Sequence, residues 1–251
     1  MWQALRQAYD DAWQFAKAWP LLVGIVVLIE GAQHAVEWMT GFYASTEAMR
    51  SAGANPLRMA LGAAKAVSIV LLGYWVARYL VSNGSRGFTT ASDVSAMRRY
   101  GIAALTYVLM TVFTVLVIAV AGTQLVERAF LPVLLLFVGA AIRTLLSFWI
   151  VGAAIAEPAA TLARSVRRTQ GSLLSGVGLM IGGTVLPFGV HYALGYGAVG
   201  ASRSLAGFIL TLDALLVGFL GVLAASLQVQ VARRVAARHG HALAVAPMAA
   251  E

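Results

Sequence analysis

The sequence predicts an all-α fold: a polytopic membrane bundle of six transmembrane helices with short amphipathic interfacial helices. Of its 251 residues, 60% are apolar and only 11% are charged, and the mean hydropathy is +0.81. A soluble domain has about 45–50% apolar and about 25% charged residues. This chain therefore carries more apolar surface than a soluble core could bury, and lipid is the expected solvent for most of it.

Six apolar windows are long enough to cross the hydrocarbon core, which takes about 20 helical residues. In chain order they are Pro20–Met39, Leu57–Val81, Tyr100–Leu125, Leu131–Ile155, Ser172–Leu194 and Ser204–Val229. Pro187 and several glycines interrupt the fifth window. Asp10 and Asp11 argue against a cleavable signal in Met1–Trp19, so the first window is expected to remain as a membrane span.

The basic residues between the windows predict the orientation. With the N-terminus in the cytoplasm, twelve Lys and Arg residues lie on the inner side and four lie on the outer side. The outer four are Arg50, Arg58, Arg128 and Arg203. We therefore expect a multi-pass protein of the bacterial inner membrane with both termini in the cytoplasm. Its parts would be an interfacial helix (1–19), a transmembrane domain (20–229) and a basic tail (230–251).

A short amphipathic stretch precedes each odd-numbered window. These stretches are Met1–Trp19, Ala91–Tyr100 and Ala160–Gln170. The pattern favours three repeated units, each an interfacial helix leading into a helical hairpin, although short basic linkers could also converge on it. In the first stretch one face is formed by Trp2, Leu5, Tyr9, Trp13 and Ala16.

The expected partners are the lipid bilayer and anionic lipid headgroups, which the basic cytoplasmic segments would meet. A membrane protein partner or a homo-oligomer is also possible. Nucleic acid is not expected, because the basic residues are not interleaved with aromatic ones. The chain has no cysteine, which excludes disulfides, thiolate metal sites and cysteine nucleophiles.

The strongest lead to a site is a polar stripe in the first window. Glu30, His34 and Glu37 are spaced by four and three residues. On a helix their side chains fall within a wedge of about 60°. Charged groups in a membrane span are costly, and they are kept where they face a protein interior, a partner or a water-filled cavity.

Charged residues on three other windows extend this polar stripe across the predicted bundle. Counting from the window ends places Glu30, Lys65, Arg143 and Asp213 near the middle of the membrane, on the first, second, fourth and sixth windows. Two acids and two bases sum to zero charge, which predicts a mutually compensating network. The network could hold the helices together, or it could form a polar pathway for protons, ions or a small solute. The same pattern would arise if the true window boundaries differ from these and some of the charged side chains extend to the membrane interface.

His191 is expected near the outer level of His34, just beyond Pro187 on the fifth window. Histidine with carboxylates is a metal-ligand set, and Glu30 and His34 are spaced to reach one ion. A proton relay or a hydrogen-bonded structural role uses the same residues. The candidates for ligand or proton binding are therefore Glu30, His34, Glu37 and His191, and the metal and cofactor remain open.

One region carries a family resemblance. Glu157-Pro158-Ala159-Ala160, Arg164-Ser165 and Thr169-x-Gly171 precede a glycine-rich span. This pattern resembles the YciC-like inner-membrane proteins and the membrane domain fused to some glycerophosphoryl diester phosphodiesterases. The resemblance implies a six-helix inner-membrane bundle and brings no catalytic residues.

The sequence therefore favours a non-enzymatic membrane protein with a polar intramembrane site on the first span. No esterase elbow, P-loop, dinucleotide fingerprint or zincin motif is present. Proton- or ion-linked transport or small-ligand binding is the leading function. The alternatives are a scaffold or accessory subunit that binds a partner helix, a pigment or a quinone, and a role in lipid or envelope homeostasis.

Overall fold

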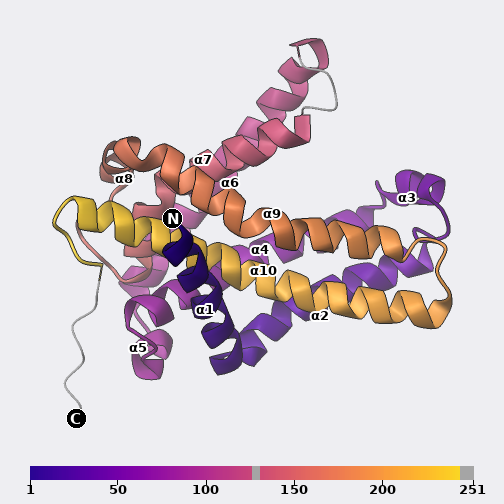
Figure 1. Ribbon diagram of the computed structural model, residues 1–251, viewed down its shortest axis with the longest axis horizontal. Helices are drawn as coiled ribbons and strands as arrows, with labels where there is room; N and C mark the ends of the chain where they lie inside the picture. The colour runs from indigo at the N-terminus through magenta and orange to yellow at the C-terminus, as the bar shows by residue number, and fades with distance from the viewer. Residues whose placement is uncertain (126–130, 244–251) are drawn as a thin grey trace. The chain divides into compact units, whose positions relative to one another are not determined.

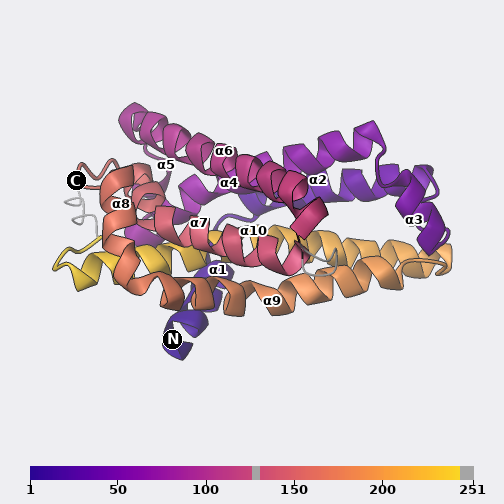
Figure 2. The ribbon, with the colours of Figure 1, turned by 90° about the horizontal axis from the view of Figure 1, so that it is seen from above.

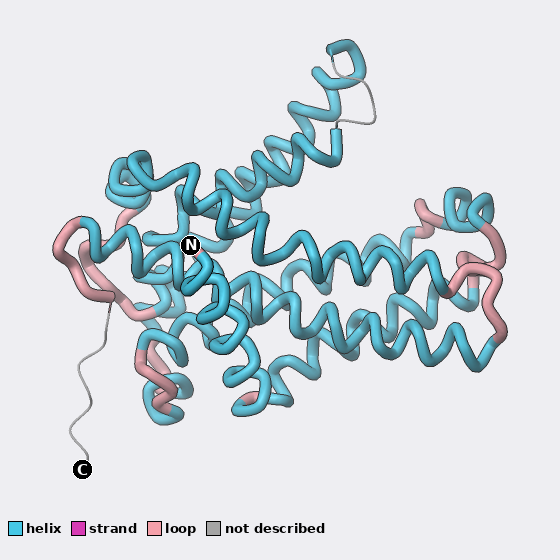
Figure 3. Tube along the Cα trace, in the orientation of Figure 1, coloured by secondary structure: helices cyan, strands magenta, loops and turns pink. Residues whose placement is uncertain are grey.

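The computed structural model describes residues 1–125 and 131–243, and over these residues it is all-helical (Figures 1 and 3). The helices are α1 (Trp2–Ala18), α2 (Pro20–Met39), α3 (Thr46–Ala52), α4 (Pro56–Val81), α5 (Arg86–Thr90), α6 (Val94–Leu125), α7 (Leu131–Ala154), α8 (Leu162–Thr169), the 3₁₀ turn η1 (Gln170–Ser172), α9 (Leu173–Gly197) and α10 (Arg203–Arg238). The predicted all-α class is confirmed.

Among the described residues, five helical runs are long and apolar enough to cross a membrane. They are Pro20–Met39, Pro56–Val81, Leu134–Ala154, Leu162–Gly197 and Arg203–Arg238. The prediction of a multi-pass membrane protein is confirmed at this level. The third predicted window lies in α6, which is not one of the five, so the count of six spans stays a prediction. Arg128 and residues 244–251 lie outside the described residues.

The chain forms two compact units. Unit 1 comprises Met1–Asp11, Tyr74–Gly183 and Ala224–Glu251, and unit 2 comprises Ala12–Gly73 and Thr184–Leu223. Helices α1, α4, α9 and α10 contribute residues to both.

Unit 1 is built around a helical hairpin. Helices α6 and α7 lie side by side (Figure 2), and α8 packs against α7. Ser165 of α8 is fully buried, and its hydroxyl enters the backbone hydrogen-bond ladder of α7. It donates to the Leu145 carbonyl (2.6 Å) and accepts from the Trp149 N–H (3.1 Å), two groups that a regular helix would pair with each other. The serine of the Arg-Ser pair thus fixes α8 on α7.

A buried arginine joins three segments of unit 1. Arg78, near the end of α4, is 1% exposed. Its guanidinium donates to the carbonyls of Phe88 (2.6 and 3.1 Å), Ala91 (3.2 Å) and Ala154 (3.1 Å), and it lies over the Phe88 ring. Arg78 is one of the twelve basic residues that the sequence places on the inner side. Its contacts show that it also links three segments of the fold.

Unit 2 contains α2, α3 and parts of α1, α4, α9 and α10. Its helices approach closely at glycines: a Cβ on Gly218 of α10 would lie 2.5 Å from Val27 of α2, and one on Gly221 would lie 3.2 Å from Ile69 of α4. At one end of the unit, Phe42 and Tyr43 pack against Ala198, Ala206 and Leu210. The Gly200 N–H donates to the Tyr43 carbonyl (2.9 Å), which ties the loop after α2 to the loop between α9 and α10. α3 lies beside these loops (Figure 1).

Two amphipathic segments differ from the expectation. Ala91–Tyr100 is not a separate interfacial helix, since α6 begins at Val94 and runs unbroken through it. Asp93 caps this start by accepting from the Ala96 N–H (2.9 Å), and Gly101 alone does not break the helix. Likewise the basic segment after residue 230 continues α10 as far as Arg238, before Gly240 adopts a φ of +65°.

The first amphipathic segment forms α1 as expected. Its buried residues are Ala4, Ala8, Asp11, Ala12 and Phe15, whereas Trp2 and Trp13 are 76% and 59% exposed. The exposed face of α1 is thus rich in tryptophan, a residue typical of a membrane interface.

Candidate functional site

The site is built on a polar face of α2. The buried residues of this helix are Val26, Glu30, Gln33, His34 and Glu37, whereas Leu21 and Leu28 are 86% and 74% exposed. The spacing of three and four residues places the polar side chains on one face. Helix α2 therefore turns its apolar side chains outward and its polar ones inward, as a helix in lipid that lines a polar interior does.

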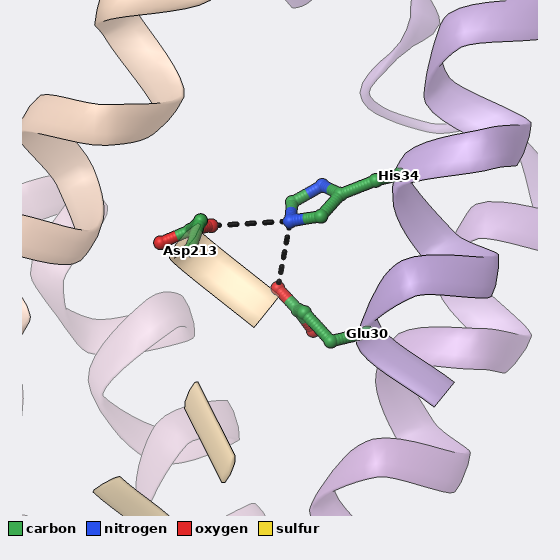
Figure 4. A group of neighbouring side chains, drawn as sticks. All are labelled: Glu30, His34 and Asp213. Carbon is green, nitrogen blue, oxygen red and sulfur yellow. Dashed lines mark hydrogen bonds and ion pairs between the residues drawn. The ribbon is translucent and has the colours of Figure 1, made fainter. Parts of the chain in front are cut away.

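His34 is the central residue of the cluster. Its Nδ1 lies 3.0 Å from Glu37 Oε2 and 2.8 Å from the Tyr43 hydroxyl. Its Nε2 lies 3.1 Å from Asp213 Oδ2 and 3.6 Å from Glu30 Oε1 (Figure 4). Both ring nitrogens thus face carboxylates, one along α2 and the other on α10.

Glu37 is held by three side chains. Arg58 Nε (2.7 Å) and Gln33 Nε2 (3.0 Å) donate to its Oε1, and the Tyr43 hydroxyl donates to its Oε2. Burial, followed by this bond to the carboxylate, raises the pKa of Tyr43 above its ordinary value. Tyr43 therefore stays a neutral donor, and Glu37 has a fixed position beside His34.

The other two carboxylates each have a partner on a further helix. Lys65 of α4 forms an ion pair with Glu30 Oε2. His191 of α9 lies with its Nδ1 2.7 Å from Asp213 Oδ1. Glu30 and Asp213 are each 1% exposed, so both carboxylates are removed from solvent. Each is held in place through one oxygen, which is Oε2 in Glu30 and Oδ1 in Asp213.

A cavity of about 290 Å³ opens onto this cluster. Its lining combines the ionisable groups with aromatic and small residues, namely Glu30, Gln33, His34, Glu37, Phe42, Tyr43, Met49, Arg58, Lys65, His191, Tyr192, Gly195, Tyr196 and Asp213. Among these described residues, three carboxylates face one lysine and one arginine, so by formal charge one negative charge is left for the histidines or for a ligand to offset.

Three of these residues could also hold a metal ion. Glu30, His34 and Asp213 each offer one ligand atom, and the three atoms lie within 4.8 Å of one another (Figure 4). His34 also lines a second, apolar groove of about 630 Å³, which α2 and α10 form with residues that include Gly31, Ala35 and Gly207.

The structure brings together six of the seven residues that the sequence singled out. Glu30, His34, Glu37, His191, Lys65 and Asp213 line one cavity of unit 2. Arg143 belongs to unit 1, where its guanidinium lies 5.4 Å from the centre of the Tyr107 ring. The depth argument grouped Arg143 with the others by its level in the membrane, which says nothing about where it lies around the bundle.

Sequence reasoning missed three residues of the cluster. Gln33 could have been found, because it is a polar residue on the inward face of α2, four positions before Glu37. In the sequence, Arg58 is one of the four outer basic residues, and Tyr43 lies beyond the end of the first window. No local pattern marks either one, because their contacts with Glu37 arise only when α4 and the loop after α2 are in place.

No protein-family model, no curated protein and no solved structure matches this chain.

Proposed function

We propose that this chain is a six-span protein of the bacterial inner membrane that binds small cations in the cavity of unit 2 and carries them across the bilayer. In this proposal the protein is not an enzyme. The observation that carries it is the composition of the cavity: among the described residues that line it, three buried carboxylates, Glu30, Glu37 and Asp213, face one lysine and one arginine, Lys65 and Arg58.

The unbalanced charge decides the sign of the ligand. An uncompensated charge in the middle of a membrane costs at least about 2.5–3.5 kcal/mol. The remaining negative charge is therefore offset by a cation, either a proton on a histidine or a bound ion. An anion would add to the imbalance, so the cavity favours cations.

The cavity has the features of a site that exchanges its ligand. Arg58, Lys65 and His191 line it, and their side chains are 25%, 19% and 23% exposed. The carboxylates beneath them are almost fully buried. The cavity thus connects partly exposed cationic side chains, which pair with Glu30 and Glu37, to carboxylates that are almost fully buried.

The packing of α6 supports a sixth span. At about 1.5 Å per residue its 32 residues reach about 48 Å, more than the hydrocarbon thickness. It packs along α7, which is long and apolar enough to cross. Six crossings place both termini on one side, and the excess of basic residues favours the cytoplasm for that side. The resemblance to YciC-like proteins is consistent with an inner-membrane location.

Currents from the reconstituted protein test this function. Proteoliposomes on a solid-supported membrane would receive steps of sodium, potassium, ammonium, magnesium and zinc chloride. We expect transient currents with at least one of these cations. Asp213→Asn should abolish them, because it removes a negative charge from the cavity without changing the size of the side chain.

The matched control is Asp10→Asn, which makes the same change at an exposed position of α1 and should leave the currents unchanged. Equal currents from the parent and from Asp213→Asn would contradict the proposal, as would a lack of current with every salt. Stable co-purification of a partner protein together with that lack of current would favour the accessory-subunit alternative.

A further inference from the structure

The three ligand atoms at the floor of the cavity have the spacing of a metal site. A tetrahedral ion with bonds of about 2.0–2.1 Å holds neighbouring ligand atoms about 3.3–3.4 Å apart. His34 Nε2 lies 3.6 Å from Glu30 Oε1 and 3.1 Å from Asp213 Oδ2. The three atoms all lie within 4.8 Å of one another, so an ion between them would bind all three once the side chains bring every pair to this spacing.

Each of the three residues also has its second polar atom held in place. Lys65 pairs with the other oxygen of Glu30, His191 lies against the other oxygen of Asp213, and Glu37 faces His34 Nδ1. Metal-binding histidines commonly donate their second N–H to a carboxylate, and metal-binding carboxylates are hydrogen-bonded at the free oxygen. The outer contacts thus direct one atom of each residue toward the same point.

A further buried polar atom, which has no hydrogen-bond partner among the described residues, belongs to a residue that lines the same cavity. Gln33 is 7% exposed, and its Oε1 accepts no hydrogen bond from any described residue, although its Nε2 donates to Glu37. A buried acceptor that lines a cavity is a position for a ligand or for a water bound to it. This atom belongs to none of the three ligand residues, so it points to an occupant independently.

We propose that Glu30, His34 and Asp213 bind one divalent transition-metal ion of the Zn²⁺ type, with a fourth coordination position open to the cavity. This inference rests on the proposed function, since it names the cation that the cavity takes. One imidazole and two carboxylates suit such an ion, whereas Ca²⁺ requires six to eight oxygen ligands.

Binding of the metal itself tests the inference. The full chain, purified in detergent without a polyhistidine tag and stripped with a chelator, would be titrated with ZnCl₂ in a calorimeter. Bound zinc would then be counted by mass spectrometry after gel filtration. We expect one zinc ion per chain. Replacement by Co²⁺ should give the strong visible absorption of a tetrahedral site.

Two variants separate ligands from their supports. His34→Ala should lose the bound zinc, and Glu37→Gln should weaken zinc binding by about 10–100-fold, the usual effect of removing an outer partner of a metal-binding histidine. His241→Ala is the matched control. His241 Nε2 also lies 3.6 Å from a carboxylate, that of Glu157 in unit 1, so its loss removes an equivalent pair away from the triad.

Either of two results would overturn the inference. A parent that retains no Zn²⁺ and no Co²⁺ after gel filtration would refute it, as would a His34→Ala variant that is folded by its melting curve and still holds one zinc ion. Currents with sodium or potassium but no zinc binding would leave the proposed transport intact and remove the metal. One bound zinc ion per chain without any current would support the metal site and contradict the proposed transport.

Discussion

Tyr43 shows how a residue outside the spans controls one inside them. It follows α2 in the loop that packs on the loop between α9 and α10, and its hydroxyl reaches back to Glu37. This bond belongs to a network in which Glu37 and the Tyr43 hydroxyl both face His34 Nδ1, and His34 Nε2 faces Asp213. A loop contact thereby helps to set the geometry of the buried cluster.

The raised pKa of Tyr43 predicts an alkaline limit to stability. In the unfolded chain the phenol loses its proton near pH 10, whereas in the folded chain it keeps it to higher pH. The stabilisation is thus complete below about pH 10 and is lost as the pH rises above it, at up to about 1.4 kcal/mol per pH unit. Melting temperatures measured from pH 9 to about pH 11 should fall less steeply for Tyr43→Phe than for the parent.

The comparison for this prediction is Tyr196→Phe, at a tyrosine that is 61% exposed. That variant should follow the parent across the pH range. A Tyr43→Phe variant with the parent's alkaline slope would show that the phenol does not carry the effect.

Single residues differ in how far sequence reasoning can reach them. Glu30, His34 and Glu37 could be grouped because helical geometry alone puts them on one face. Lys65 and Asp213 could be added because the length of a membrane span fixes their depth. Depth leaves the position around the bundle open, which is why Arg143 was grouped with the cluster and Arg58 was not. The locations of Arg143 and Arg58 around the bundle depend on how the helices pack, and no short sequence pattern indicates that packing.

At the scale of elements, helix packing in this chain depends on small residues and on polar side chains that bond to backbone. Gly218 and Gly221 allow α10 to approach α2 and α4, and Ser165 enters the ladder of α7. Lipid offers little hydrophobic drive for two helices to associate, so close packing and hydrogen bonds supply it. Windows of apolar residues predicted the helices well, because length and hydropathy decide them, but they could not show these contacts.

Arg78 gives the sharpest test at this scale. Its planar guanidinium bonds to carbonyls of α5, of the residue after it and of α7 at the same time. Arg78→Met should lower the free energy of unfolding by about 3 kcal/mol, because buried carbonyls lose charge-assisted bonds. Arg78→Lys should recover only part of the lost stability, since one ammonium group cannot donate to all these carbonyls in the geometry of the planar guanidinium. Denaturation in detergent, followed by circular dichroism, measures both.

Arg98→Met, at an exposed position of α6, is the control for lost charge and should melt as the parent does. A full recovery of stability in Arg78→Lys would contradict the role assigned to the guanidinium.

At the scale of the whole molecule, the open question is how many times the chain crosses the membrane. Five runs are long and apolar enough among the described residues, and α6 would be the sixth span. The parity of the crossings fixes which segments share a side. If α6 and α7 both cross, the loop before α6 and helix α8 face the same compartment; if only α7 crosses, they face opposite ones.

The lack of cysteine makes this parity measurable without background labelling. Ser92 precedes α6, Ala163 lies in α8, Ser51 lies in α3, and all three are exposed. With six spans, Ser51→Cys should react with a membrane-impermeant maleimide in intact cells. Ser92→Cys and Ala163→Cys should react only after the inner membrane is opened. The unmodified chain, which should not react at all, is the control. Labelling of Ala163→Cys in intact cells, with Ser92→Cys still protected, would mean that α6 does not cross. The cytoplasmic placement of the C-terminus would then be wrong, because α9 and α10 would leave that end on the opposite side.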